Sequence, residues 1–289
     1  IYLFMNDQYE ITLDKFNVIK EIGGGTTFVI YLVQDRETCM QYAAEVSINS
    51  RVLFTNMIEF MKNYHHPTLV NLTGYSTHDF NGHNNITLIT DYVINGSLQN
   101  YLKKATLDET SLQIILVGIC RGMMFIHEKH YIHRYLKPSN ILLDENLFPR
   151  ISGLTCLTKI EGQSECIQKV DTPIYTAPEI WSRNAPYDYK TDVYAFSFLM
   201  FEVVTGLKAF KQIEGLFSLY DELIQGDRPV FTVNIKPSIK SLIEKCWSGD
   251  PKERLSFDEL FDKLAFNSKY YLDNVDKDKL NAYVESIRN

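Results

Sequence analysis

The sequence lacks the features of several large protein classes. No apolar run reaches the 18 or more residues that a membrane-spanning helix needs, and the apolar-rich stretch at residues 195–201 ends at Glu202. The five cysteines are odd in number, widely scattered and without a Cys-x-x-Cys pair, so neither a disulfide framework nor a zinc site is expected. Free thiols fit a reducing compartment, and we expect a cytoplasmic protein.

The sequence also has fewer basic than acidic residues. Lysine and arginine number 29 against 36 aspartates and glutamates, which gives a net charge of −7. A nucleic-acid-binding face is usually basic, so no nucleic-acid partner is expected. Hydrophobic residues make up 45% of the 289 residues, a globular composition in a chain long enough for two lobes.

Strand patterns precede helix patterns along the chain, and the change occurs near residues 92–96. Short β-branched and apolar runs predict strands at residues 16–22, 29–33, 40–48, 69–72 and 86–92. Helical patterns occupy residues 51–64, 112–127, 191–205, 238–247 and 256–265. We therefore predict an α+β fold, with an N-terminal extension (1–15), a strand-rich lobe (16–92), a helix-rich lobe (93–267) and a C-terminal tail helix (268–289). A cleft between two lobes is a natural ligand site.

The tail carries one apolar stripe. Leu280, Tyr283, Val284 and Ile287 follow the i, i+3, i+4, i+7 spacing of a helix face. Packing of this face on the domain core is the favoured interpretation, since such stripes usually face a core. A helix that binds a partner is the alternative.

Several segments, in this order, resemble protein kinases of the serine/threonine, tyrosine-kinase-like type. They are Ile-Thr-Asp-Tyr-Val at 89–93, His-Arg-Tyr-Leu-Lys-Pro-Ser-Asn at 133–140, Thr-Pro-Ile-Tyr-Thr-Ala-Pro-Glu at 172–179, Lys-Thr-Asp-Val-Tyr at 190–194, Cys-Trp at 246–247 and Arg254. Each match alone is weak, but the ordered set is specific. The resemblance implies a bilobal kinase-like fold with a small β-rich N-lobe and a larger helical C-lobe.

The glycine loop that covers the nucleotide phosphates in kinases is only partly matched. Gly23 and Gly25 fit the G-x-G-x-x-G-x-V pattern, but Phe28 stands at the third glycine and Ile30 at the valine. Glycine lets the backbone approach phosphate because it has no Cβ. Phe28 either adds bulk to the nucleotide space or folds out to solvent or onto the lobe, and both interpretations stay open.

The residues that pair across the N-lobe in kinases are replaced. Glu45 stands where the resemblance places the strand lysine, so a carboxylate replaces the ammonium that faces the phosphates. Ala43 and Glu45 share a face of the strand, because side chains alternate. Met57 stands at the partner glutamate of the helix, and Glu59 should point elsewhere.

The positions for the catalytic base and the metal ligand are also changed. Tyr135 stands at the base aspartate, and a tyrosine of ordinary pKa, about 10, is a poor base near neutrality. Gly153 stands at the metal-binding aspartate and offers no side-chain oxygen to magnesium. Lys137 and Asn140 are retained, and no metal site is expected.

Scaffold positions of the kinase pattern are kept. By resemblance, Glu179 pairs with Arg254 and Asp192 holds the catalytic loop through hydrogen bonds. His133 belongs to an apolar spine, and Arg134 could bind a phosphorylated Thr158, Ser164 or Thr172, although ordinary exposed hydroxyls are the simpler interpretation. The resemblance also assigns a nucleotide cleft to Ile30, Ala43, Thr90, Asp91, Val93 and Leu142.

These observations predict a pseudokinase, a kinase fold without phosphoryl transfer. We expect it to act as a signalling scaffold or allosteric partner of another protein, with an active kinase as one candidate, and without a cofactor. A weakly active serine/threonine kinase, a domain that binds ATP without magnesium, and a purely structural role are the alternatives.

Overall fold

The computed structural model describes residues 7–25, 27–48, 54–160, 173–181, 188–210 and 216–288. The chain divides into two compact units after Ile94, and residues 66–68 belong to the second unit. This division lies two residues beyond the predicted end of the strand-rich lobe.

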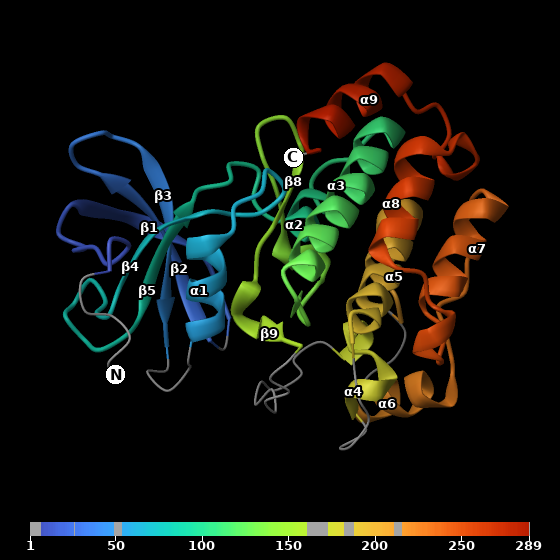
Figure 1. Ribbon diagram of the computed structural model, residues 1–289, viewed down its shortest axis with the longest axis horizontal. Coiled ribbons are helices and arrows are strands. Elements are labelled where there is room, and N and C mark those ends of the chain that lie inside the picture. Colours follow the sequence, from blue (N-terminus) through green and yellow to red (C-terminus); the bar gives the residue numbers. More distant parts are fainter. Residues whose placement is uncertain are drawn as a thin grey trace. The chain divides into compact units, whose positions relative to one another are not determined.

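The first unit is built on an antiparallel sheet with strand order β1-β2-β3-β5-β4 (Figure 1). One face of the sheet carries a core of buried apolar residues. Helix α1 buries a second apolar set. The strands are β1 (Phe16–Gly24), β2 (Phe28–Asp35), β3 (Gln41–Ser47), β4 (Leu72–Ser76) and β5 (Thr87–Asp91), and the helix is α1 (Thr55–Asn63). The sheet core comprises Leu13, Phe16, Val33, Ala44 and Ile89. Helix α1 buries Met57, Ile58, Phe60 and Met61.

The strand predicted at residues 69–72 is misplaced. Strand β4 begins at Leu72, and the preceding residues Leu69 and Val70 are buried without belonging to a strand. A short apolar run indicates burial, but periodicity alone does not fix its backbone conformation.

Helix α3 (Glu109–Glu128) is the central helix of the second unit and packs against α8, α9 and β8 (Figure 1). It begins after Asp108, whose carboxylate accepts a hydrogen bond from the Ser111 backbone nitrogen and so caps the first turn. The other helices are α2 (Leu98–Tyr101), α4 (Pro178–Trp181), α5 (Lys190–Thr205), α6 (Leu216–Gln225), α7 (Pro237–Cys246), α8 (Phe257–Phe266) and α9 (Lys277–Ser286). Two strand pairs complete the unit: β6 (Tyr131–Ile132) with β9 (Thr158–Lys159), and β7 (Ile141–Leu143) with β8 (Pro149–Ile151).

By length and hydropathy, α3 is the one helix in the described ranges that could cross a membrane. Two thirds of its apolar window is buried within the protein, as in the core helix of a globular domain.

The C-terminal helix α9 packs its apolar stripe inward. Leu280, Tyr283, Val284 and Ile287 are all at most 2% exposed. The stripe therefore faces the core of the second unit, as the favoured interpretation of the sequence expected.

Candidate functional site

The loop at residues 133–140, called the catalytic loop below, contains Tyr135, Lys137 and Asn140 and is held by Asp192 of α5. The buried carboxylate of Asp192 accepts hydrogen bonds from the backbone nitrogens of His133 (2.8 Å) and Arg134 (2.7 Å). Nε2 of His127 lies 2.9 Å from its Oδ2. Burial alone would raise the pKa of Asp192, but these hydrogen bonds and the neighbouring His127 hold it below its usual value. The backbone of the catalytic loop is therefore hydrogen-bonded to a carboxylate that is charged at neutral pH.

Tyr135 engages the retained lysine. Nζ of Lys137 donates a hydrogen bond to the phenol oxygen of Tyr135 at 2.9 Å, and the ammonium lies 4.0 Å from the centre of the tyrosine ring. A cation over an aromatic face is attracted by the ring's quadrupole. The tyrosine that the resemblance assigns to the base position thus also fixes the direction of the lysine beside it.

Asn140 and Gly153 are packed tightly against each other. Nδ2 of Asn140 donates a hydrogen bond to the carbonyl of Tyr135 at 2.6 Å, so its side chain turns toward the loop. Gly153 has a φ of 72°, and a Cβ built there would lie 2.5 Å from Cγ and Nδ2 of Asn140. Glycine adopts this left-handed conformation without the strain that most other residues incur. In the described conformation the Asn140 side chain fills the space beside Gly153, so a larger residue there would require Asn140 to move.

Arg134 contacts one of the three hydroxyls that the sequence suggested as phosphorylation sites. Its Nη1 donates a hydrogen bond to Oγ1 of Thr158 at 3.2 Å, and this hydroxyl in turn donates to the Cys156 carbonyl at 3.1 Å. Thr158 lies in β9 and is buried. Its hydroxyl is enclosed in this conformation, while Ser164 and Thr172 lie outside the described residues.

Glu45 lies on the face of the sheet that the strand alternation predicted. It is paired in register with Ile30 of β2 and Leu88 of β5, and Ala43 shares its face two residues away. The side chain is half-buried, and burial raises the pKa of Glu45 to about 7. Charging this carboxylate as the pH rises from its ordinary pKa through 7 therefore costs stability. No ion pair between described residues includes Glu45.

Helix α1 buries Met57, the residue that the resemblance assigns to the partner glutamate. Met57 is 3% exposed, whereas Glu59 lies on the exposed side of the helix. The helix therefore presents a thioether to the core of the unit.

Phe28 does not point into solvent. It is 9% exposed, and its ring centre lies 5.0 Å from that of Phe54, which immediately precedes α1. Phe28 is two residues from Ile30 along β2, so the two share a face with Glu45. Of the open interpretations, packing onto the lobe is the one observed. The role of Phe54 could not be predicted from the sequence, because its pairing with Phe28 depends on how the two segments fold together.

The remaining residues assigned to the nucleotide cleft lie in both units. Thr90 and Val93 are buried, and Oδ2 of Asp91 accepts hydrogen bonds from Asn71 at 3.1 Å and 2.9 Å. Leu142 of β7 belongs to the second unit and forms a bridge with Ser97. Within the first unit, the pairing of β3 with β5 places Ala43 opposite Thr90.

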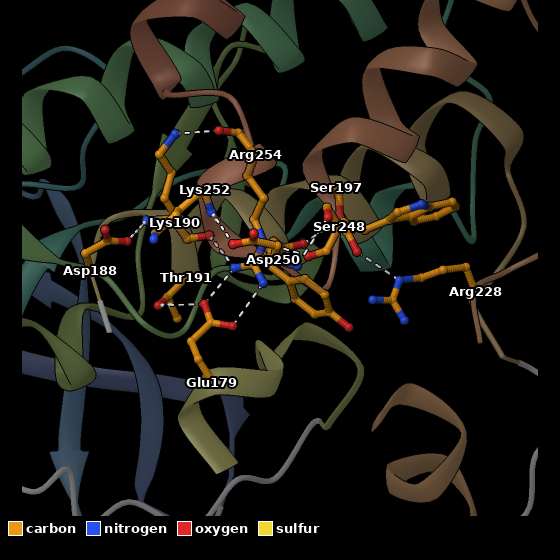
Figure 2. A network of polar contacts seen from close by, with 12 residues as sticks. Glu179, Asp188, Lys190, Thr191, Ser197, Arg228, Ser248, Asp250, Lys252 and Arg254 are labelled. Atoms are coloured by element: carbon orange, nitrogen blue, oxygen red, sulfur yellow. Dashed lines mark hydrogen bonds and ion pairs between the residues drawn. The ribbon is translucent and has the colours of Figure 1, made fainter. Parts of the chain in front are cut away.

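Arg254 and Glu179 form the ion pair that the resemblance implies (Figure 2). The arginine side chain is fully buried, and its Nη1 and Nη2 donate to the two Glu179 oxygens at 2.6 Å and 2.9 Å. It also donates to the carbonyls of Ser248 (2.9 Å) and Lys190 (3.0 Å) and lies 5.0 Å from the Tyr194 ring centre. Because both charges are buried and paired, removal of either partner would leave the other buried without its counterpart.

A cavity of about 200 Å³ beside the catalytic loop was not predicted from the sequence. Lys137 lines it, together with Tyr175 and Glu202. The Tyr175 hydroxyl donates to Glu202 at 2.9 Å, and the Ala209 backbone nitrogen donates to the other oxygen at 3.1 Å. Burial raises the pKa of Glu202 despite these bonds. Tyr175 and Glu202 are 27 residues apart, so no local pattern could have linked them.

Comparison with known proteins identifies the fold. The family model described as protein tyrosine and serine/threonine kinase matches residues 34–264. The chain is 28% identical over 263 residues to the putative serine/threonine-protein kinase/receptor R826 of Acanthamoeba polyphaga mimivirus, which covers 88% of this chain and 15% of the relative.

Two further relatives come from other organisms. The chain is 24% identical over 266 residues to serine/threonine-protein kinase STY17 of Arabidopsis thaliana, covering 89% of this chain and 45% of the relative. It is 25% identical over 272 residues to dual specificity protein kinase pyk3 of Dictyostelium discoideum, covering 92% of this chain and 20% of the relative. The chain spans less than half the length of each. It belongs to the protein tyrosine and serine/threonine kinase family and has the bilobal fold of that family, with a β-sheet N-lobe and a helical C-lobe.

Proposed function

We propose that this kinase-family domain does not transfer phosphate and acts by binding another protein, as a signalling scaffold or allosteric partner. An active kinase is one candidate for that partner. The proposal includes a cytoplasmic location, supported by the four free cysteines among the described residues.

The single observation that carries the proposal is the closed packing of Tyr135, Asn140 and Gly153. Phosphoryl transfer depends on positioning and on charge stabilisation by metal ions. Here Tyr135 and Gly153 supply no carboxylate, and Asn140, whose Nδ2 donates to the Tyr135 carbonyl, offers only the neutral oxygen of its amide. The described residues therefore do not fit a magnesium–ATP complex.

The N-lobe supports the same proposal. Glu45 and Met57 cannot form the lysine–glutamate ion pair that active kinases require. The carboxylate of Glu45 repels the phosphates of ATP when it is ionised. Because its pKa is raised to about 7, its ionised fraction, and with it the repulsion, increases as the pH rises through 7. Phe28, which replaces a loop glycine by the resemblance, places an aromatic ring on the same face of the sheet.

The names of the relatives favour a second candidate, a weakly active or ATP-binding serine/threonine kinase. STY17 and R826 are both named as kinases. Their identities of 24% and 28% allow the fold to be shared while catalytic positions differ.

A thermal-shift titration with ATP separates the candidates. A ligand that binds only the folded protein raises its stability by about 2.7 kcal/mol at 100 times Kd, so 1 mM ATP would give this shift for a Kd of about 10 μM. We expect no shift at millimolar ATP with or without magnesium, for the unmodified protein and for the exposed-site control Glu21→Gln.

Each other outcome contradicts part of the proposal. A shift without magnesium would favour nucleotide binding without catalysis. A shift that requires magnesium and disappears in Glu45→Ala would favour the enzyme, with Glu45 as an unusual metal ligand.

A further inference from the structure

The segment before β1 runs along the edge of the sheet. The Tyr75 backbone nitrogen of β4 donates to the Tyr9 carbonyl, and the Ile11 nitrogen donates to the Tyr75 carbonyl, both at 2.8 Å. Glu10 and Tyr75 form a parallel bridge. Strand β4 is an edge strand of the sheet, so residues 9–11 cover its otherwise unpaired backbone groups.

The segment is seated closely against that strand. A Cβ at Gly74 would lie 2.8 to 3.0 Å from three carbon atoms of the Ile11 side chain. Beyond Ile11, Leu13 enters the sheet core next to Phe16. The Ile11 side chain therefore fills the space beside Gly74, and the backbone hydrogen bonds to Tyr75 fix the register.

Asp7 anchors the start of this segment to helix α1. Its carboxylate is paired with Nζ of Lys62 in the last turn of α1, accepts a hydrogen bond from the Tyr75 hydroxyl at 2.8 Å, and is only 7% exposed. Burial alone would raise the pKa of Asp7, but Lys62, the Tyr9 backbone nitrogen and Tyr75 lower it below its usual value. Asp7 is therefore charged at neutral pH and joins three elements at one point.

A second contact from the same segment reaches the same turn of α1. The Tyr9 hydroxyl lies 3.4 Å from the Lys62 carbonyl, and the Lys62 ammonium lies 5.8 Å from the Tyr9 ring centre. Tyr9 thus lies close to both the backbone carbonyl and the side-chain ammonium of Lys62.

Active kinases fix the corresponding helix with an ion pair from β3. Here β3 and α1 carry Glu45 and Met57 at those positions. Among ion pairs between described residues, Asp7–Lys62 is the one that includes α1. An electrostatic tie to this helix thus comes from the N-terminal segment.

We propose that residues 7–13 form a latch that holds α1 against the sheet in place of the β3–α1 ion pair, and that opening this latch releases the helix. The device is independent of whether the protein transfers phosphate, because it involves none of the catalytic-loop residues. A binding event or modification that displaces the segment would change the position of α1 without touching the nucleotide cleft.

Hydrogen exchange of the α1 backbone amides tests the latch. In Asp7→Asn we expect exchange at residues 59–63 to rise by about 10- to 100-fold, the factor that corresponds to loss of one charge-assisted hydrogen bond. Amides of the β2–β3 pairing should stay unchanged. Lys62→Gln removes the other partner and should give the same pattern, whereas Glu10→Gln, an exposed change on the same segment, should give none.

Two results would overturn the latch. Unchanged α1 exchange in both Asp7→Asn and Lys62→Gln would show that the ion pair does not hold the helix. A rise of equal size in α1 and in β2–β3 would mean that the segment only adds to the overall stability of the lobe.

Discussion

Replacing Arg254 with methionine is expected to lower the free energy of unfolding of the helical lobe by about 3 to 5 kcal/mol. Methionine keeps much of the side-chain length but leaves the Glu179 carboxylate, which is 9% exposed, without its partner. The carbonyls of Ser248 and Lys190 lose their donors as well. A buried charge without a partner is among the few causes of so large an effect.

Urea denaturation measures this loss, and the neighbouring position supplies a matched control. Lys252→Met makes the same cation-to-thioether change on an exposed residue, and surface changes of this kind usually stay within about 0.5 kcal/mol. Equal midpoints for Arg254→Met and Lys252→Met would show that the Glu179–Arg254 pair adds nothing to the fold.

Gly118→Ala is expected to destabilise the same lobe by about 1 to 3 kcal/mol. A Cβ at Gly118 would lie 2.1 Å from the Tyr283 hydroxyl oxygen and 2.5 Å from Cγ of Pro149, so α3 and α9 could not keep their spacing. Helix propensity alone predicts the opposite sign, a gain of about 1 kcal/mol for alanine over glycine. The sign of the measured change therefore reports whether α9 is packed on α3.

Tyr283→Phe refines this test. The Tyr283 hydroxyl is buried and has no hydrogen-bond partner among the described residues, so its removal should leave stability unchanged or raise it. In the double variant with Gly118→Ala it should recover part of the loss, because the nearest clashing atom is gone. Stabilisation by Gly118→Ala alone, or no recovery in the double variant, would contradict the docking of α9.

The sequence was sufficient for the parts of the protein that depend on local pattern. The ordered motifs around residues 133–140 and 172–179 predicted the family and the two-lobe fold, which the family match and the structure confirm. Strand alternation placed Ala43 and Glu45 on one face, as the β2–β3 register has it. The helical stripe on the tail predicted the buried face of α9.

Features that depend on contacts between distant residues were beyond the sequence. Asp7 and Lys62 are 55 residues apart, and no spacing rule connects them. The direction of Phe28 depends on the place of Phe54. The sequence showed that Gly153 lacks an oxygen ligand, but its positive φ and its contact with Asn140 follow only from the fold.

Transfer of labelled γ-phosphate from ATP with magnesium, to the protein itself and to a general serine/threonine acceptor, tests the central claim most directly. Kinases turn over at about 1 to 100 per second, and loss of the base alone at the 10⁴-fold end leaves under about 0.01 per second. We predict incorporation no higher than in Lys137→Ala or in a reaction without magnesium. Magnesium-dependent incorporation that is lost in Lys137→Ala and kept in the control Glu21→Gln would contradict the account.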